Sequence, residues 1–150
     1  MTKRLLMTCL LFLAVSAAAS AAGPGRLGVG IILFDPSGLS AKAWLSRSNA
    51  LAGGIGWSAE HEHYLHIHAD FLFFRHRLAG DRNLDLDFYL GVGGKIIFRD
   101  DDSAWFRVPL GVDFLLRKSP LNFFFELVPS FNFSEIKLFG AIGFRYLFER

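Results

Sequence analysis

The chain has 150 residues, of which 52% are hydrophobic, 20% are charged and 17 are phenylalanine. This aromatic composition excludes a disordered chain, and the single cysteine, Cys9, excludes a scaffold held together by disulfides. Sixteen Lys and Arg against 14 Asp and Glu give a pI near 8.9, a value that would suit a nucleic-acid partner.

Residues 1–22 have the pattern of a secretory signal peptide. Lys3 and Arg4 form a positive start, an apolar segment covers 5–15, and the small residues that follow include cleavage sites of the A-x-A kind. The apolar segment is far shorter than the ~20 residues that span a bilayer, so we expect cleavage and not a membrane anchor. Loss of Lys3 and Arg4 leaves 14 basic and 14 acidic residues, and the case for a nucleic-acid partner disappears.

Apolar and polar residues alternate along the predicted mature chain, residues 23–150, and this period of two indicates strands. In the most regular segment, Leu86 and Phe88 share one face while Asp85 and Asp87 share the other. Eight segments follow the pattern: 27–33, 39–46, 51–58, 65–73, 84–98, 105–116, 121–133 and 138–148.

Clusters of Gly, Pro, Asn, Asp and Ser separate these segments, and the longest predicted connection covers 75–83. Such short connections require antiparallel neighbours, because a parallel crossover needs a dozen or more residues. The predicted mature chain has about 16 residues for each strand and its connection, close to a membrane-spanning strand of ~9–11 residues plus a turn, and an even strand number is usual in bacterial membrane barrels. We therefore predict an all-β fold, an eight-stranded antiparallel up-and-down transmembrane β-barrel.

The alternation leaves two orientations open, since a soluble barrel of the lipocalin kind would bury the apolar face. Glycines in the polar row favour the membrane orientation, because the interior of an eight-stranded barrel is only just wide enough for side chains. Charges of both signs suit an enclosed ion-pair network. The predicted interior network comprises Lys42, His66, His68, Asp70, Asp85, Asp87, Lys95, Arg107, Asp113, Glu126 and Arg145.

Aromatic residues near the ends of the apolar rows are candidates for the girdles that mark the membrane boundary. The predicted girdle comprises Trp57, Phe98, Phe106, Phe114, Phe133, Tyr146 and Phe148. The segment 143–148 also resembles the aromatic C-terminal signal by which the barrel-assembly machinery recognises its clients, although Glu149 and Arg150 follow it. We expect that machinery as a partner during biogenesis.

A family resemblance rests on four segments: GIILFDPSGLSAKAWL (30–45), LHIHADF (65–71), RVPLGVDF (107–114) and the aromatic stretch 124–148. They resemble a family of small, functionally uncharacterised bacterial barrels that are similar to the transmembrane domain of OmpA. The resemblance covers essentially the whole predicted mature chain. It implies an eight-stranded barrel in the outer membrane of a Gram-negative envelope, and it transfers no functional residue.

One stretch of the chain is rich in metal-ligand residues. His66, His68 and Asp70 share a strand face with a spacing that could ligate Zn²⁺ or Cu²⁺, and His61 and His63 could form a loop site. The alternatives are an interior hydrogen-bond network and ordinary polar loop residues. Because the spacing supplies no closed tetrahedral set, we expect no metal and no cofactor.

Candidates for catalysis are few. Some eight-stranded barrels modify lipid A with a His and a Ser, and Ser58 with His61 or His63 is the comparable set in this chain. The run 100–102, three aspartates, could bind a cation but also fits a solvated turn. We expect no enzyme activity.

With the N-terminus in the periplasm, the predicted loops differ in charge between the two sides, although loop solvation alone would also place charges there. The outer loops hold Asp35, Glu60, Glu62, Asp100, Asp101, Asp102 and Glu135. The periplasmic turns hold Arg47, Arg75, Arg77, Arg82, Arg117 and Lys118.

The sequence thus predicts an integral outer-membrane barrel with a filled, non-conducting interior and a structural or surface-interaction role. Its partners would be membrane lipid and an unidentified surface partner, with no nucleic acid. A soluble periplasmic barrel that binds an apolar ligand is the first alternative, and a lipid A-modifying enzyme is the second.

Overall fold

A computed structural model describes residues 26–34, 37–57 and 64–148, with the side chains of 75–78 left undescribed. The predicted signal peptide therefore lies outside the described residues. Within the described part of the chain, no helix is long and apolar enough to cross a membrane.

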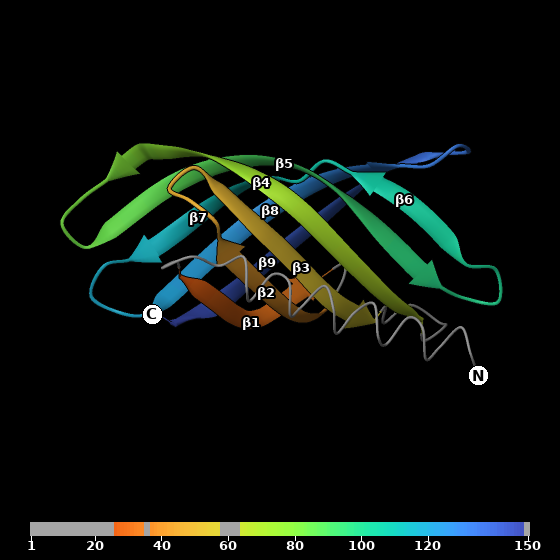
Figure 1. Cartoon of the computed structure of the whole chain (residues 1–150), viewed down its shortest axis with the longest axis horizontal. Coiled ribbons are helices and arrows are strands. Elements are labelled where there is room, and N and C mark those ends of the chain that lie inside the picture. Colours follow the sequence, from red (N-terminus) through yellow and green to blue (C-terminus); the bar gives the residue numbers. More distant parts are fainter. Residues whose placement is uncertain (1–25, 35–36, 58–63, 149–150) are drawn as a thin grey trace.

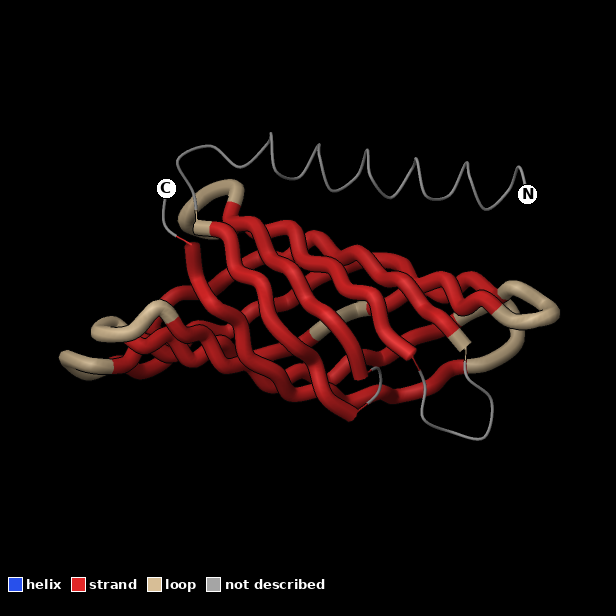
Figure 2. Tube along the Cα trace, turned by 90° about the horizontal axis from the view of Figure 1, so that it is seen from below, coloured by secondary structure: helices blue, strands red, loops and turns tan. Residues whose placement is uncertain are grey.

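Nine strands form one antiparallel sheet that closes on itself, as Figures 1 and 2 show. Their order in the sheet is β4-β3-β2-β1-β9-β8-β6-β5-β7, and additional pairings of β4 with β5 and of β7 with β8 complete the ring. The strands are β1 Leu27–Phe34, β2 Ser37–Trp44, β3 Asn49–Trp57, β4 Leu65–Gly80, β5 Leu84–Phe98, β6 Ser103–Arg107, β7 Leu110–Leu116, β8 Leu121–Phe131 and β9 Ile136–Phe148.

Strands β6 and β7 are two halves of one wall element, interrupted at Val108 and Pro109. Pro109 has no N–H to donate to the ladder, which is the physical cause of the interruption. The register nevertheless continues across it, because the Val108 N–H donates to the Pro129 carbonyl at 2.9 Å and the Gly91 N–H donates to the Pro109 carbonyl at 2.8 Å. The closed barrel thus has eight antiparallel wall elements, and the predicted fold class is confirmed.

The predicted connection 75–83 is wrong in its extent. Strand β4 continues to Gly80, with a register irregularity between Arg75 and Ala79, and pairs with β5 along this length. The turn itself is closed by the Asp81 N–H, which donates to the Leu84 carbonyl at 2.9 Å, and by the Asn83 N–H, which donates to Asp81 Oδ1 at 2.7 Å. This end of β4 extends past β3, and its sequence lacks the regular alternation of apolar and polar residues from which the strands were predicted.

Burial alternates along most of the wall, most clearly in β8. Asn122, Glu126 and Ser130 point into the barrel and are buried, whereas Phe123 and Phe125 point outward with 43% and 46% of their surface exposed. This pattern is the reverse of that in a soluble protein, and it holds around the sheet, since eight charged residues among those described are buried inside. The barrel therefore has a polar core and an apolar outer surface.

The connections β2–β3, β4–β5 and β7–β8 lie at one end of the barrel, and the connections β5–β6 and β8–β9 lie at the other (Figure 1). We call these the inner end and the outer end, after the orientation that the sequence predicts. The inner end carries exposed Arg47, Arg82, Arg117 and Lys118, and the outer end carries exposed residues 100–102 and Glu135. Arg75 and Arg77, predicted to lie in a turn, belong to β4 instead. Asp35, Glu60 and Glu62 lie outside the described residues.

Candidate functional site in the barrel interior

The interior of the barrel gathers the polar residues of every wall element. The buried polar and charged residues are Ser40, Lys42, His66, His68, Asp70, Asp87, Lys95, Arg107, Asp113, Asn122, Glu126, Ser130 and Arg145. Ten of them belong to the predicted network, whereas the predicted set did not include Ser40, Asn122 and Ser130. These three lie at inward positions of the alternating pattern, which was the signal that would have found them.

Asp85 does not lie in the interior, contrary to its place in the predicted network. It sits near the inner end of β5, where its carboxylate accepts hydrogen bonds from Arg117 Nε at 2.9 Å and Arg117 Nη2 at 2.6 Å. The two side chains are 25% and 41% exposed, so water also solvates them. These hydrogen bonds raise the pKa of Arg117 above its usual value.

At the centre of the barrel, one guanidinium lies between two carboxylates. Arg107 Nη2 donates to Glu126 Oε1 at 3.1 Å, and Arg107 Nε lies 2.9 Å from Asp70 Oδ1. The second oxygen of Glu126 accepts a hydrogen bond from the Tyr89 hydroxyl at 2.7 Å. These four side chains come from β4, β5, β6 and β8, so the cluster connects half of the wall. Tyr89 was not among the predicted network residues.

Toward the inner end, an ammonium group is enclosed by aromatic rings. Lys42 Nζ pairs with Asp113 Oδ2 and lies 4.3 Å from the Phe74 ring centre, 4.7 Å from that of Trp44 and 4.8 Å from that of Tyr89. Both charged side chains are fully buried. Ring faces attract cations, so the aromatic residues and the carboxylate together replace the water that Lys42 loses on burial.

A second guanidinium is held by neutral partners. Arg145 Nε donates to Ser40 Oγ at 3.0 Å, and Arg145 Nη1 donates to Asn122 Oδ1 at 3.4 Å. Its guanidinium carbon lies 3.8 Å from the centre of the Phe124 ring. The hydroxyl, the amide and the ring thus hold this cation in place in the interior.

Near the outer end the interior becomes aromatic and basic. Lys95 Nζ lies 3.6 Å from the Phe139 ring centre and 5.8 Å from that of Trp105. His68 is the register partner of Lys95 on the neighbouring strand. His66 Nε2 and His68 Nδ1 are buried and accept or donate no hydrogen bond within the described residues.

The buried charges balance within the described residues. Four cations and four carboxylates lie in the interior: Lys42, Lys95, Arg107 and Arg145 against Asp70, Asp87, Asp113 and Glu126. A balanced set avoids the large cost of an isolated buried charge, and the bridging contacts hold side chains across the space that the wall encloses. This arrangement can rigidify the barrel and obstruct its interior.

The geometry offers no cluster of metal-ligand residues within the part of the chain that the structure describes. His66, His68 and Asp70 share the inner face of β4, but Asp70 pairs with Arg107, and no group of three or more potential ligand residues is arranged to hold a metal. Ser58, His61 and His63, the candidate catalytic set, lie outside the described residues.

Six of the predicted girdle residues lie on the outer surface of the wall, whereas Phe133 lies in the β8–β9 connection beyond the end of β8. Trp57, Phe106, Phe133, Tyr146 and Phe148 are exposed, and the other two, Phe98 and Phe114, are half-buried. Three of the rings belong to close aromatic pairs, since Tyr146 stacks edge-on against Phe148 at 4.9 Å and Phe106 stacks on Phe131 at 5.7 Å.

Comparison with known proteins identifies a similar fold. The chain is similar to the N-terminal β-barrel domain of OprF from Pseudomonas aeruginosa, with a TM-score of 0.58 and 13% sequence identity over 83% of this chain and 96% of that one. At this identity the likeness is one of fold, and it agrees with the predicted similarity to OmpA-like barrels. No family model and no curated protein sequence matches the chain, so membership of the uncharacterised barrel family stays a prediction.

Proposed function

We propose that the protein is an integral barrel of the bacterial outer membrane, exported by a cleaved signal peptide, with a non-enzymatic structural role in the envelope. One observation carries the proposal: charged side chains fill the interior, while large apolar side chains cover the outside of the closed wall. A wall of this kind suits acyl chains, because every backbone group is paired within the closed sheet.

A soluble barrel that binds an apolar ligand is the weaker alternative. Such a protein needs an apolar chamber, whereas the interior here holds eight buried charges among the described residues. It would also expose a continuous apolar surface to water, and soluble monomers seldom expose patches beyond a few hundred Å².

The interior is proposed to be non-conducting. Lys42 and Asp113 bridge it toward the inner end, and Arg107, Asp70 and Glu126 fill it at the centre. An eight-stranded barrel has room for little more than its own side chains, so these bridges leave no continuous water path.

The role in the envelope is proposed to be structural, with at most a small surface interaction. The outer connections are short, at 35–36, 58–64, 99–102 and 132–135, which leaves little surface for a large receptor. A lipid A-modifying activity would change the mass spectrum of lipid A when the protein is overproduced. We expect an unchanged spectrum.

The deciding experiment is a carbonate wash of membranes from cells that express the full chain, followed by gel electrophoresis of boiled and unboiled samples. A membrane barrel remains in the pellet and migrates differently when it is not boiled, and its mature N-terminus begins near residue 23. A soluble periplasmic protein serves as the extraction control. Release into the wash, without a heat-modifiable form, would overturn the proposal.

A further inference from the structure

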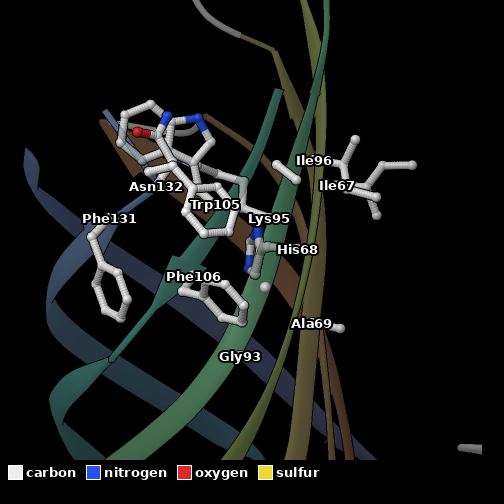
Figure 3. A pocket seen from close by; sticks show the side chains of 13 residues that line it. Ile67, His68, Ala69, Gly93, Lys95, Ile96, Trp105, Phe106, Phe131 and Asn132 are labelled. Carbon is white, nitrogen blue, oxygen red and sulfur yellow. The ribbon is translucent and has the colours of Figure 1, made fainter. Parts of the chain in front are cut away.

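A groove of about 710 Å³ opens on the wall where β4, β5, β6 and the outer end of β8 meet. Figure 3 shows that Ile67, Ala69 and Ile96 lie on one side of the strands that form it, while His68 and Lys95 lie on the other side, which faces the interior. The volume lies within the ~300–1,000 Å³ typical of ligand pockets. Four lining residues, His68, Gly93, Lys95 and Trp105, face the interior, whereas the outward-facing side chains that border the groove on β4, β5 and β6 are apolar.

The floor of the groove is made of small residues that the packing of the barrel does not demand. Ala69 and Gly94 form one cross-strand pair on the outer face, and Ala104 continues the floor on β6. A Cβ atom added to Gly94 would have the Trp105 carbonyl oxygen, at 3.8 Å, as its nearest neighbour. The adjacent Gly93 faces inward, where a Cβ would overlap the Asp70 carboxylate and the backbone. Packing thus requires a glycine at 93 but not at 94.

Bulky residues border this floor on both sides along the strands. The pair Ile67–Ile96 lies toward the outer end, and the pair Phe71–Val92 lies toward the inner end. These two pairs are four residues apart, or roughly 14 Å at ~3.4 Å per residue, and their own side chains narrow the gap further. The stacked rings of Phe106 and Phe131 form the third border.

The width between these borders determines which kind of molecule can reach the floor of the groove. An α-helix with its side chains is ~10–12 Å across, and a second barrel presents a still broader convex wall, so neither reaches the floor. A hydrocarbon chain is only one methylene wide, so it passes between the borders and reaches the floor. Because lipid tails and apolar side chains are alike in polarity, such van der Waals contact is the main source of binding energy inside a bilayer.

The groove also has a direction. At Ala104 it turns toward the β8–β9 connection, where Asn132 and Phe133 line it. The polar end of an occupant would therefore lie at the outer end, among the exposed polar residues of the turns, with its chain following the groove to the floor at Gly94 and Ala69.

We propose that this groove is a binding site for one acyl chain of a lipid from the outer half of the membrane. The inference rests on the proposed function, since it needs the outer wall to face lipid. It adds a defined site to that function, with Ala69 and Gly94 as the floor and Ile96 and Phe106 as borders.

The experiment compares lipid retention by the full-length mature protein and its variants. Each protein is reconstituted in phosphatidylethanolamine vesicles, extracted in mild detergent and weighed by native mass spectrometry. The wild type is expected to retain one phospholipid, and Gly94→Leu and Ala69→Leu, which fill the floor, are expected to reduce the retained fraction at least fivefold. Ala41→Leu is the matched control, because Ala41 is an exposed outward alanine on β2 that does not line the groove.

The outcomes distinguish failure of the groove proposal from failure of the proposed function. Heat-modifiable migration and insertion into vesicles are scored on the same samples, and failure to insert would overturn both claims. Inserted barrels that retain no lipid, or retain it equally in all variants, would overturn the groove alone. A dimer mass that Gly94→Leu abolishes would assign the groove to a second copy and also contradict the acyl-chain site. Ala69→Leu provides the second reading if Gly94→Leu does not fold.

Discussion

Lys42 and Asp113 pair across the interior of the barrel although 71 residues separate them in the chain. Their strands are not neighbours, since β2 lies between β1 and β3 whereas β7 lies between β5 and β8. The ion pair therefore crosses the enclosed space and does not run along the wall. It ties together two sides of the barrel that hydrogen-bonded strand pairing does not connect.

Replacement of Lys42 by Met should destabilise the barrel strongly. The substitution keeps the length of the side chain but leaves the fully buried Asp113 without its cation, a change that costs ~3–5 kcal/mol for buried pairs. The measurement is the urea midpoint of unfolding in detergent micelles, followed by heat-modifiable migration. The double variant Lys42→Met with Asp113→Asn should recover much of the loss, and no recovery would mean that the aromatic cage matters more than the pair.

Arg107→Leu should have an effect of similar size, ~3–5 kcal/mol, because two buried carboxylates lose their shared cation. Tyr89→Phe removes one hydrogen bond to Glu126 and should cost less, ~1–3 kcal/mol. The order of the two unfolding midpoints is the test. Equal midpoints for wild type and Arg107→Leu would show that Asp70 and Glu126 do not depend on this guanidinium.

The exposed pair Asp85–Arg117 should behave differently from the buried pairs. Both groups are partly solvated at the inner end, and exposed ion pairs contribute little because water and salt screen them. Arg117→Ala and Asp85→Ala should therefore leave the unfolding midpoint unchanged within error. A large shift in either variant would place this pair in the interior network after all.

Much of this architecture could be predicted from the alternation of residue types. A period of two assigns each residue to a face, and the positions of Lys42, Arg107 and Glu126 inside the barrel follow from that assignment. The alternation fails where β4 extends past the end of β3, because this end of the strand pairs with β5 and no longer with β3. The alternation in β5 assigns Asp85 to the inward face, but this residue lies so near the inner end of the barrel that the wall does not shield it from water.

Partners across the interior could not be predicted from the sequence. Which inward residues meet depends on the stagger of all the strands when the sheet closes, and a single sequence does not specify that stagger. Tyr89 on β5 thus reaches Glu126 on β8, a contact that alternation within either strand does not indicate. The acyl-chain groove could not be predicted either, because Ala69 and Gly94 become neighbours on the outer face only when β4 pairs with β5.

Neighbouring glycines on β5 provide a test of the packing on the two faces. Gly93→Ala should prevent the barrel from forming, because its Cβ would overlap the backbone of β4, which cannot move without breaking the ladder. Gly94→Ala should be neutral or slightly stabilising, by up to ~0.5–1 kcal/mol, since its Cβ makes only an ordinary van der Waals contact, 3.8 Å from the Trp105 carbonyl oxygen, and alanine loses less entropy on folding. The measurement is the fraction of heat-modifiable protein after refolding. Equal yields from the two variants would contradict the assignment of the faces.

The bridges also predict how the barrel behaves in a planar bilayer. The wild type should show no sustained ionic current, because the side chains of Lys42 and Asp113 meet across its interior. The double variant Lys42→Ala with Asp113→Ala removes both charges together, so no lone buried charge remains, and it opens space at the inner end. The cluster of Arg107, Asp70 and Glu126 still fills the centre, so this variant alone should remain closed. Adding Arg107→Ala, Glu126→Ala and Asp70→Asn, which together leave no carboxylate of this cluster without its cation, should admit a current. Steady conduction by the wild type would show that the interior is not obstructed.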